Sequence, residues 1–166
     1  MNVTSTGLER GYFFDRFGKR GNQKNSFGKV DYSIPFSIAE APKDTGSFAF
    51  WLEDKDAIPV CGFSWIHWVG ANLNRSTVAE NESISNSHFI QGANSNVSPL
   101  AGAHSIEESS YYTSMSPPDT DHLYELHVFA LDTMLDLGSG FFLNELYRKM
   151  QGHVLDTATL SGYYRA

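Results

Sequence analysis

Two polar rings begin an otherwise apolar run near the end of the chain. In HLYELHVFAL, residues 122–131, His122 and Tyr124 are separated by one residue. Because side chains of an extended strand alternate between its two faces, both rings point to the same face as Leu126. An imidazole and a phenol can donate hydrogen bonds to phosphate or carboxylate oxygens. The pattern predicts a strand whose polar end forms one wall of a small binding site.

Two further segments place polar side chains at the ends of predicted strands. Asp54 and Asp56 follow the alternating run SFAFWLED, and His67 lies within GFSWIHWVGANL. A carboxylate that accepts a hydrogen bond from an imidazole fixes its tautomer and raises its basicity. We therefore expect these segments to converge with the His122 segment on one pocket. A lone histidine beside a tryptophan is more often a core residue, so it is the combination that indicates a site.

The composition of the 166-residue chain limits its function. A hydrophobic fraction of 41% and an aromatic fraction of 14% predict a folded domain over residues 1–166. The formal net charge of −7 argues against a protein that coats nucleic acid, because such binding needs clustered basic side chains. Cys61 is the only cysteine, and we find neither a secretory signal nor an apolar run of about 18 residues. We expect no disulfide, no transmembrane segment and a cytoplasmic location.

The order of patterns along the chain predicts a mostly β fold. The expected strands lie within residues 31–39, 47–54, 62–73, 123–131 and 154–165. The one clear helix is SGFFLNELYRKMQG, with Ser139 as its N-cap and Gly152 at its end. Residues 1–30 include the only basic segment, which we expect to be a loosely ordered arm or a surface hairpin. Residues 72–116 contain few large apolar side chains, which is typical of a functional or mobile loop.

Together, these motifs resemble one protein family. LEDKDAIPVCGFSWIHWVGANL resembles the D-P-D-A-P…H-W-x-x-x-N-[IL] signature of phosphatidylethanolamine-binding proteins, the group that includes Raf kinase inhibitor protein. YYTSMSPPDTDHLYELHVFALDTMLDL resembles their second signature, Y-x-G-P-x-P-P…H-x-Y-x-F-x-[LV]-[YF]-A-L-D. The QGANS segment and the ending GHVLDTATLSGYYR are similar to the bacterial and archaeal YbhB/YbcL-type branch. The likeness runs from about Ser47 to the C-terminus, with a weaker match back to Asp31.

The resemblance implies a fold and a binding site. The fold is a large antiparallel Greek-key sheet packed with a smaller sheet, plus C-terminal helical structure. The site is a small pocket at one end of the strands that takes an anionic, typically phosphate-like, group. Carried over by position, the ligand-binding residues are Asp54, Asp56, His67, Tyr112, Ser114, Pro117, His122 and Tyr124. The resemblance also implies no cofactor, a homodimer, and regulation of a kinase or protease partner.

The chain departs from both signatures at the pocket. Lys55 and Ile58 replace the two prolines of D-P-D-A-P, which predicts a less rigid acidic loop. Ser114 and Met115 replace the Gly-Pro of the second signature. A hydroxyl and a bulkier side chain there would narrow the pocket or change its donors.

Two functions follow from these residues. The first is a non-enzymatic protein that binds a phosphate-like head group, with an affinity that rises as pH falls from about 8 to 6 because imidazoles titrate there. The alternative is a hydrolase in which Asp54, His67 and His122 hold a metal ion, or Ser114 is a nucleophile. No His-x-His spacing and no G-x-S-x-G motif supports it. We also expect Cys61 to be a buried, unreactive thiol and His104 to lie on a surface loop.

Overall fold

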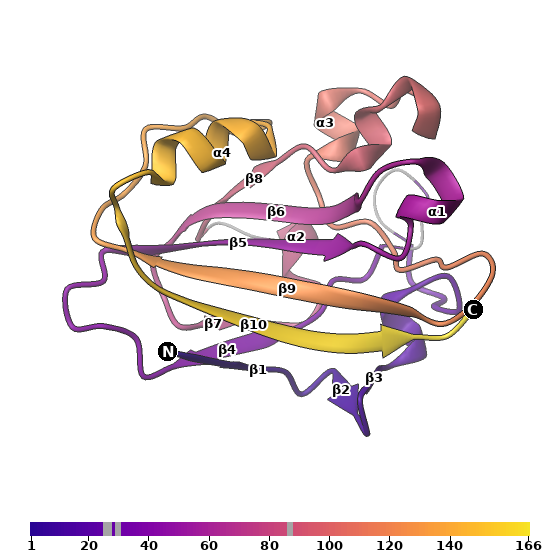
Figure 1. The fold of residues 1–166 in the computed structure, drawn as a ribbon, viewed down its shortest axis with the longest axis horizontal. Helices are drawn as coiled ribbons and strands as arrows, with labels where there is room; N and C mark the ends of the chain where they lie inside the picture. The colour runs from indigo at the N-terminus through magenta and orange to yellow at the C-terminus, as the bar shows by residue number, and fades with distance from the viewer. Residues whose placement is uncertain (25–27, 29–30, 86–87) are drawn as a thin grey trace.

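The computed structural model describes residues 1–24, 28, 31–85 and 88–166, and the chain folds into two packed sheets (Figure 1). The strands are β1 (Asn2–Thr4), β2 (Leu8–Glu9), β3 (Tyr12–Phe13), β4 (Phe36–Ala39), β5 (Ser47–Asp54), β6 (Trp65–Leu73), β7 (Thr77–Val78), β8 (Ile90–Gly92), β9 (His122–Leu131) and β10 (Val154–Tyr164). The helical elements are η1 (Asp15–Phe17), α1 (Ile58–Cys61), α2 (Glu82–Ser85), η2 (Ser95–Val97), η3 (Pro99–Ala101), α3 (Ile106–Ser109) and α4 (Leu143–Met150).

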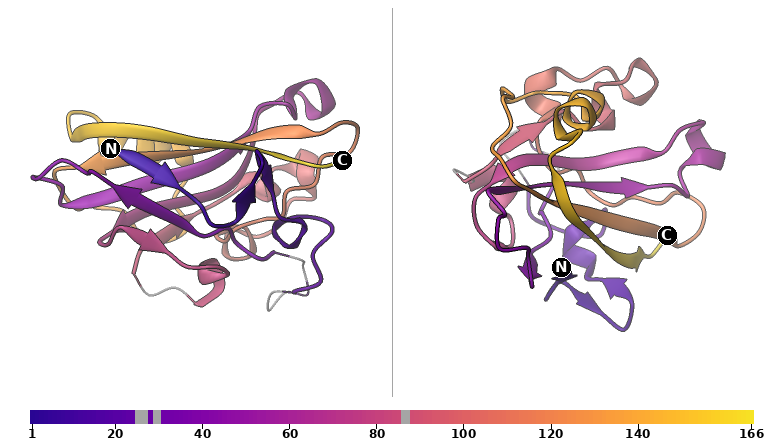
Figure 2. Two further views of the ribbon diagram at one scale, coloured as in Figure 1. Left: turned by 90° about the horizontal axis from the view of Figure 1, so that it is seen from below. Right: turned by 60° about the vertical axis from the view of Figure 1, so that its left-hand side comes forward.

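Within the described residues, the large sheet has the order β2-β3-β10-β9-β5-β6-β8 and the small sheet the order β1-β4-β7. The strand pairs are antiparallel except for β3 with β10. Figure 2 shows the small sheet stacked against one face of the large sheet. The predicted mostly β fold with a C-terminal helix is therefore confirmed.

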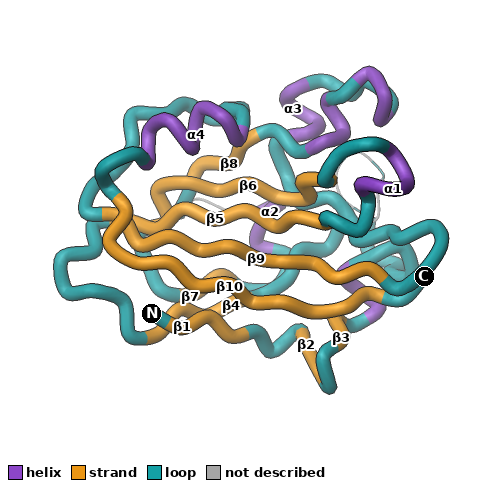
Figure 3. Tube along the Cα trace, viewed as in Figure 1, coloured by secondary structure: helices purple, strands orange, loops and turns teal. Residues whose placement is uncertain are grey.

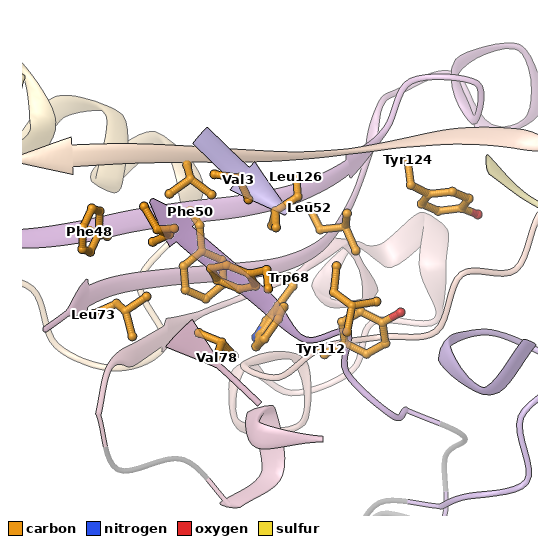
Figure 4. Packing of buried hydrophobic residues seen from close by; sticks show 14 of the residues in the cluster. Val3, Phe48, Phe50, Leu52, Trp68, Leu73, Val78, Tyr112, Tyr124 and Leu126 are labelled. Atoms are coloured by element: carbon orange, nitrogen blue, oxygen red, sulfur yellow. The ribbon is translucent and has the colours of Figure 1, made fainter. Parts of the chain in front are cut away.

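The alternation of β5 explains how the large sheet is packed on both faces. Phe48 and Phe50 point into the main core between the two sheets, where Phe50 packs edge-to-face on Trp68 with ring centroids 4.9 Å apart (Figure 4). Trp51 points to the opposite face, where it joins a second core under α4 with Leu146. Because both faces of β5 are covered, every residue from Phe48 to Leu52 is apolar.

Helix α4 is shorter than the sequence pattern predicts. It begins at Leu143, and the predicted N-cap Ser139 lies outside it. Gly140 has a φ of +82°, a left-handed conformation that interrupts any earlier helical turn. The backbone N–H of Phe142 instead donates to the Glu145 carboxylate at 2.7 Å, which starts the helix there. At the other end Gly152 has a φ of +83°, as expected of a residue that follows a helix.

The N-terminal segment is packed against the second signature. Phe13 and Phe17 are buried in the main core. Gly18 forms a bridge with Met115, and the backbone N–H of Lys19 donates to the Met115 carbonyl at 2.8 Å. Of the predicted arm, residues 25–27 and 29–30 lie outside the described part of the chain. We call residues 15–20 the strap.

After β6, the described residues up to 116 form only short elements, in line with their composition. The end of this segment runs beside β6, since the backbone N–H of Thr113 donates to the His67 carbonyl at 2.8 Å. The α3 turn is started by a capping box between Ser105 and Glu108. Figure 3 shows that loops and short helices gather at the end of the large sheet where α1 lies, and the candidate site is at this end.

Candidate functional site

Antiparallel register brings the sequence motifs together at one end of the large sheet. Asp54, the last residue of β5, lies opposite Tyr124 in β9 and opposite Trp65 at the start of β6. His67 follows two positions into β6, and His122 begins β9. The motifs are distant in sequence, so the pairing of β5 with both neighbours is what assembles the site.

A cavity of about 620 Å³ opens at this end of the sheet. Its walls come from the strap, α1, the starts of β6 and β9, and the returning loops. The residues that line it are Lys19, Asp31, Asp54, Ala57, Val60, Cys61, Trp65, His67, Asn96, His104, Thr113, Ser114, Ser116, Pro118, His122 and Tyr124. Its volume exceeds that of a phosphate group alone, so it has room for the rest of a small ligand.

Asp54 and His122 form a buried pair at the wall of the cavity. The Asp54 Oδ2 atom lies 2.8 Å from His122 Nδ1, and both residues are buried. The second oxygen of Asp54 accepts the backbone N–H of Ala57 at 3.1 Å, which fixes the carboxylate. His122 Nε2 lies 2.8 Å from Asp119 Oδ1. Burial lowers the pKa of His122, but its hydrogen bonds to Asp54 and Asp119 outweigh this and raise it above the ordinary value.

His67 is held in its neutral form. Its Nδ1 atom lies 3.0 Å from the carbonyl oxygen of Thr113. A carbonyl only accepts, so Nδ1 carries a proton and donates it. Burial lowers the pKa of His67 to about 4, so at neutral pH the ring is uncharged and Nε2 is an acceptor.

The Tyr124 hydroxyl is buried near the Asp54 carboxylate and the Ser116 backbone N–H but completes no well-formed hydrogen bond with either. Tyr124 is 0% exposed, and among the described residues no group completes a hydrogen bond with its hydroxyl. Burial, followed by the nearby negative charge of Asp54, raises its pKa above the ordinary value, while the Ser116 backbone N–H acts in the opposite direction. The ring packs edge-to-face on His67 with centroids 5.1 Å apart. Figure 4 shows Tyr124 at one end of the main core, with Phe48 at the other. The hydroxyl is thus a donor that is available to a ligand.

Five of the eight predicted site residues line the cavity: Asp54, His67, Ser114, His122 and Tyr124. The other three lie outside its lining, where each has a different contact. Asp56 accepts the backbone N–H of Leu123 at 2.8 Å, and the Tyr112 hydroxyl donates to the Phe17 carbonyl at 2.5 Å. The Pro117 carbonyl accepts from Lys19 Nζ at 2.6 Å, which positions this ammonium group at the cavity.

Sequence reasoning did not include several lining residues. Lys19 belongs to the basic N-terminal segment, and its position depends on the strap, which sequence patterns do not reveal. Asp31 holds the second signature in place, since it accepts from the Ser114 backbone N–H at 2.8 Å and from its hydroxyl at 3.2 Å. The predicted surface residue His104 and the predicted buried thiol Cys61 both line the cavity, and Cys61 is partly exposed. Cys61 is the last residue of α1 in the connection between β5 and β6, and His104 lies between η3 and α3.

Comparison with protein families gives a match over residues 4–165 to the family described as phosphatidylethanolamine-binding protein. The chain belongs to the phosphatidylethanolamine-binding protein family. The predicted resemblance is therefore confirmed.

The chain is 41% identical over 148 residues to the uncharacterised protein YxkA of Bacillus subtilis (strain 168), an alignment that covers 87% of this chain and 88% of YxkA. It is 32% identical over 152 residues to a UPF0098 protein of Chlamydia trachomatis serovar D, covering 89% of this chain and 92% of that protein.

Crystal structures of two bacterial proteins share the fold. CT736 of Chlamydia trachomatis, described as a homologue of phosphatidylethanolamine-binding protein, superposes with a TM-score of 0.80 at 27% identity, covering 99% of this chain and 97% of CT736. YbcL of Escherichia coli superposes with a TM-score of 0.75 at 20% identity, covering 99% of this chain and 98% of YbcL, and at this identity it supports the fold alone. Among the described residues, no helix is long and apolar enough to cross a membrane.

Proposed function

We propose that the chain is a non-enzymatic protein whose cavity binds the phosphate-like head group of a small anionic molecule. The observation that carries this proposal is the Tyr124 hydroxyl, which is fully buried, lines the cavity and has no partner among the described residues. An unpaired buried hydroxyl costs about 1–3 kcal/mol, a cost that a ligand oxygen would remove. Regulation of a kinase or protease stays a prediction from the resemblance.

The surrounding groups favour an anion that carries a proton. Tyr124 can donate to an anionic oxygen, and the Lys19 ammonium group supplies positive charge at the cavity. Neutral His67, with Nδ1 occupied by Thr113, can only accept through Nε2. A phosphate monoester has a second pKa near 6 and carries a hydroxyl in its monoanion, which suits this acceptor.

The hydrolase alternative has a less favourable geometry at Ser114. The Ser114 hydroxyl donates to Asp31 Oδ1 at 3.2 Å, whereas a serine nucleophile needs a base that takes its proton, usually a histidine. Turnover of a phosphate or carboxylate ester by the purified protein would favour this alternative over stoichiometric binding.

Histidine-selective NMR of the purified protein, titrated with O-phosphoethanolamine and repeated after chelator treatment, tests the proposal. We expect the His67 and His122 signals to shift together and to saturate with or without chelator. Shifts that need a metal ion would support the metal-site alternative. Signals that stay unchanged at millimolar ligand would rule out a head-group site in this cavity.

The pH dependence separates titration of the ligand from titration of the protein. Because the pKa of His67 is about 4, this ring stays neutral between pH 8 and 6, and its charge does not change there. We expect inorganic phosphate to bind more tightly as pH falls through this range, since its monoanion becomes more abundant. Sulfate carries no proton in this range, so it should show a smaller increase that reflects only the titratable groups of the protein.

A further inference from the structure

The His122 ring lies between two carboxylates. Its Nδ1 atom is 2.8 Å from Asp54 and its Nε2 atom is 2.8 Å from Asp119. Because carboxylate oxygens only accept, both ring nitrogens carry protons in this arrangement and the ring is positively charged. Both donors of His122 are therefore already occupied in the protein without ligand.

The two carboxylates differ in how firmly they are held. The Asp54 side chain is 4% exposed and also accepts the Ala57 N–H at 3.1 Å, so it cannot leave without exposing a buried charge pair. The Asp119 side chain is 54% exposed. It lies in the short turn between Pro118 and the start of β9, three residues before His122. Asp119 can therefore turn into solvent at little cost, whereas Asp54 cannot.

The charges around the ring come from several elements. The titratable groups that line the cavity with His122 are Lys19, Asp31, Asp54, Cys61, His67, His104 and Tyr124. With Asp119 in place, three aspartates stand near two cations among the described residues, Lys19 and the doubly protonated His122. Removing the Asp119 charge would leave two aspartates and two cations, which is more favourable for an incoming anion.

We infer that Asp119 sets the anion affinity of the site, because its carboxylate holds the His122 Nε2–H and competes for it with an anionic ligand. This inference rests on the proposed function. A ligand reaches this donor only by displacing Asp119, so it must accept hydrogen bonds strongly enough to offset the free-energy cost of freeing Asp119. Phosphate compounds meet this requirement better than simple carboxylates, because they present more oxygens and more charge.

The test compares Asp119→Asn with the wild-type protein by isothermal titration at pH 7 and constant ionic strength. Asparagine keeps the size of the side chain and removes its charge. We expect inorganic phosphate and O-phosphoethanolamine to bind roughly threefold to fivefold more tightly to the variant, the upper part of the range for one solvent-exposed charge pair. Acetate should gain no more than phosphate, because displacing Asp119 costs every ligand the same and the removed charge repels a phosphate dianion more than a carboxylate. Asp119→Ala is a second variant. Alanine, unlike asparagine, has no side-chain N–H that would itself donate to the anion.

Asp121→Asn is the matched control. Asp121 lies in the same turn, but its carboxylate accepts from the Tyr12 hydroxyl at 3.0 Å and from the Ala166 N–H at 3.1 Å. The substitution makes the same change in net charge without touching His122. We expect its phosphate affinity to stay within about twofold of the wild type.

The outcomes separate the inference from the proposed function. Wild-type binding with unchanged or weaker binding by both Asp119 variants would overturn the inference and leave the proposed function intact. Weaker binding of O-phosphoethanolamine alone would mean that Asp119 receives the ammonium group, which also overturns it. If neither wild type nor variant binds phosphate and the His67 signal stays fixed, the proposed function fails and the inference fails with it.

Discussion

At the scale of single residues, the site is marked by a difference between two buried tyrosines. The Tyr112 hydroxyl donates to the Phe17 carbonyl, whereas the Tyr124 hydroxyl has no partner among the described residues. Burial removes both from water, and only Tyr112 regains a well-formed hydrogen bond on folding, whereas Tyr124 has only the nearby Asp54 carboxylate and Ser116 N–H. A buried polar group without a partner commonly indicates a ligand site, and Tyr124 is where we expect the ligand oxygen.

Replacing Tyr124 with Phe should separate stability from binding. We expect the free energy of unfolding to stay the same or to rise by about 1 kcal/mol, because the variant no longer buries an unpaired hydroxyl. Phosphate affinity should fall by about tenfold. Tyr112→Phe is the control, and it should lose about 1 kcal/mol of stability with unchanged affinity. Urea unfolding and calorimetric titration measure the two effects, and equal behaviour of the variants would contradict this assignment.

His67 should contribute to acid destabilisation. Burial lowers its pKa in the folded state to about 4, while the unfolded chain has the ordinary value of 6.5. Between these values the unfolded state binds more protons, so stability falls as pH falls, by up to about 3 kcal/mol. The His67→Asn side chain can still donate to Thr113 but does not titrate. In this variant the decrease in the free energy of unfolding between pH 6.5 and 4 should be smaller by about 3 kcal/mol. Urea unfolding at several pH values measures this difference. An NMR titration midpoint near pH 6.5 for the His67 ring would refute the prediction.

At the scale of elements, the strap joins the N-terminal segment to the cavity. Lys19 reaches Pro117 only because Gly18 lies directly against Met115. The φ of Gly18 is −142°, so its role here is steric and does not depend on a left-handed backbone. A Cβ atom at Gly18 would overlap the Tyr164 ring and the Met115 carbonyl oxygen.

Gly18→Ala should therefore displace the strap. We expect a loss of about 1–3 kcal/mol in the free energy of unfolding, as for other overpacked sites, together with weaker phosphate binding because Lys19 moves. The control is Gly138→Ala, since a Cβ atom there has nothing within 4 Å, and its stability should change by less than about 0.5 kcal/mol. Thermal unfolding and phosphate titration distinguish the two variants. If Gly18→Ala is destabilised but binds phosphate with unchanged affinity, Lys19 does not contribute to the binding site.

At the scale of the whole molecule, the cavity joins parts of the chain that are far apart in sequence. The only cysteine of the chain, Cys61, lines the cavity and is partly exposed. Its reactivity should therefore report whether the cavity is occupied. Its Sγ atom lies 3.3 Å from the carbonyl oxygens of both Ala57 and Phe63, which holds the thiol at the end of α1.

Ligand binding should protect Cys61 from thiol reagents. With O-phosphoethanolamine at ten times its dissociation constant, we expect the rate of reaction with a disulfide reagent to fall by up to about tenfold. The absorbance of the released thiolate measures the rate. Tyr124→Phe at the same ligand concentration should show less protection. An unchanged rate in the wild type under saturating ligand would place the bound molecule away from α1.

Five strands (β4, β5, β6, β9 and β10) and five of the eight predicted site residues follow from sequence for a physical reason, whereas the short strands β1, β2, β3, β7 and β8 were not predicted. Side-chain alternation in β9 places His122 and Tyr124 on one face whatever the rest of the fold does, and the two signatures supply Asp54 and His67. The start of α4 was predicted incorrectly, because the left-handed conformation of Gly140 cannot be distinguished from a helical glycine by its sequence context.

The resemblance of two motifs to known signatures indicated the family, and alternation and composition predicted the mostly β fold and the polar face of β9, since these depend on local periodicity and on residue identity. The tertiary structure alone decided which groups meet. Lys19 contacts Pro117 across 98 positions of sequence, and the turn after Pro118 directs Asp119 to His122 Nε2. It also decided that His67 is neutral and that Tyr124 lacks a partner. Protonation and hydrogen-bond pairing depend on burial and on atoms within a few ångströms, which only the packed chain specifies.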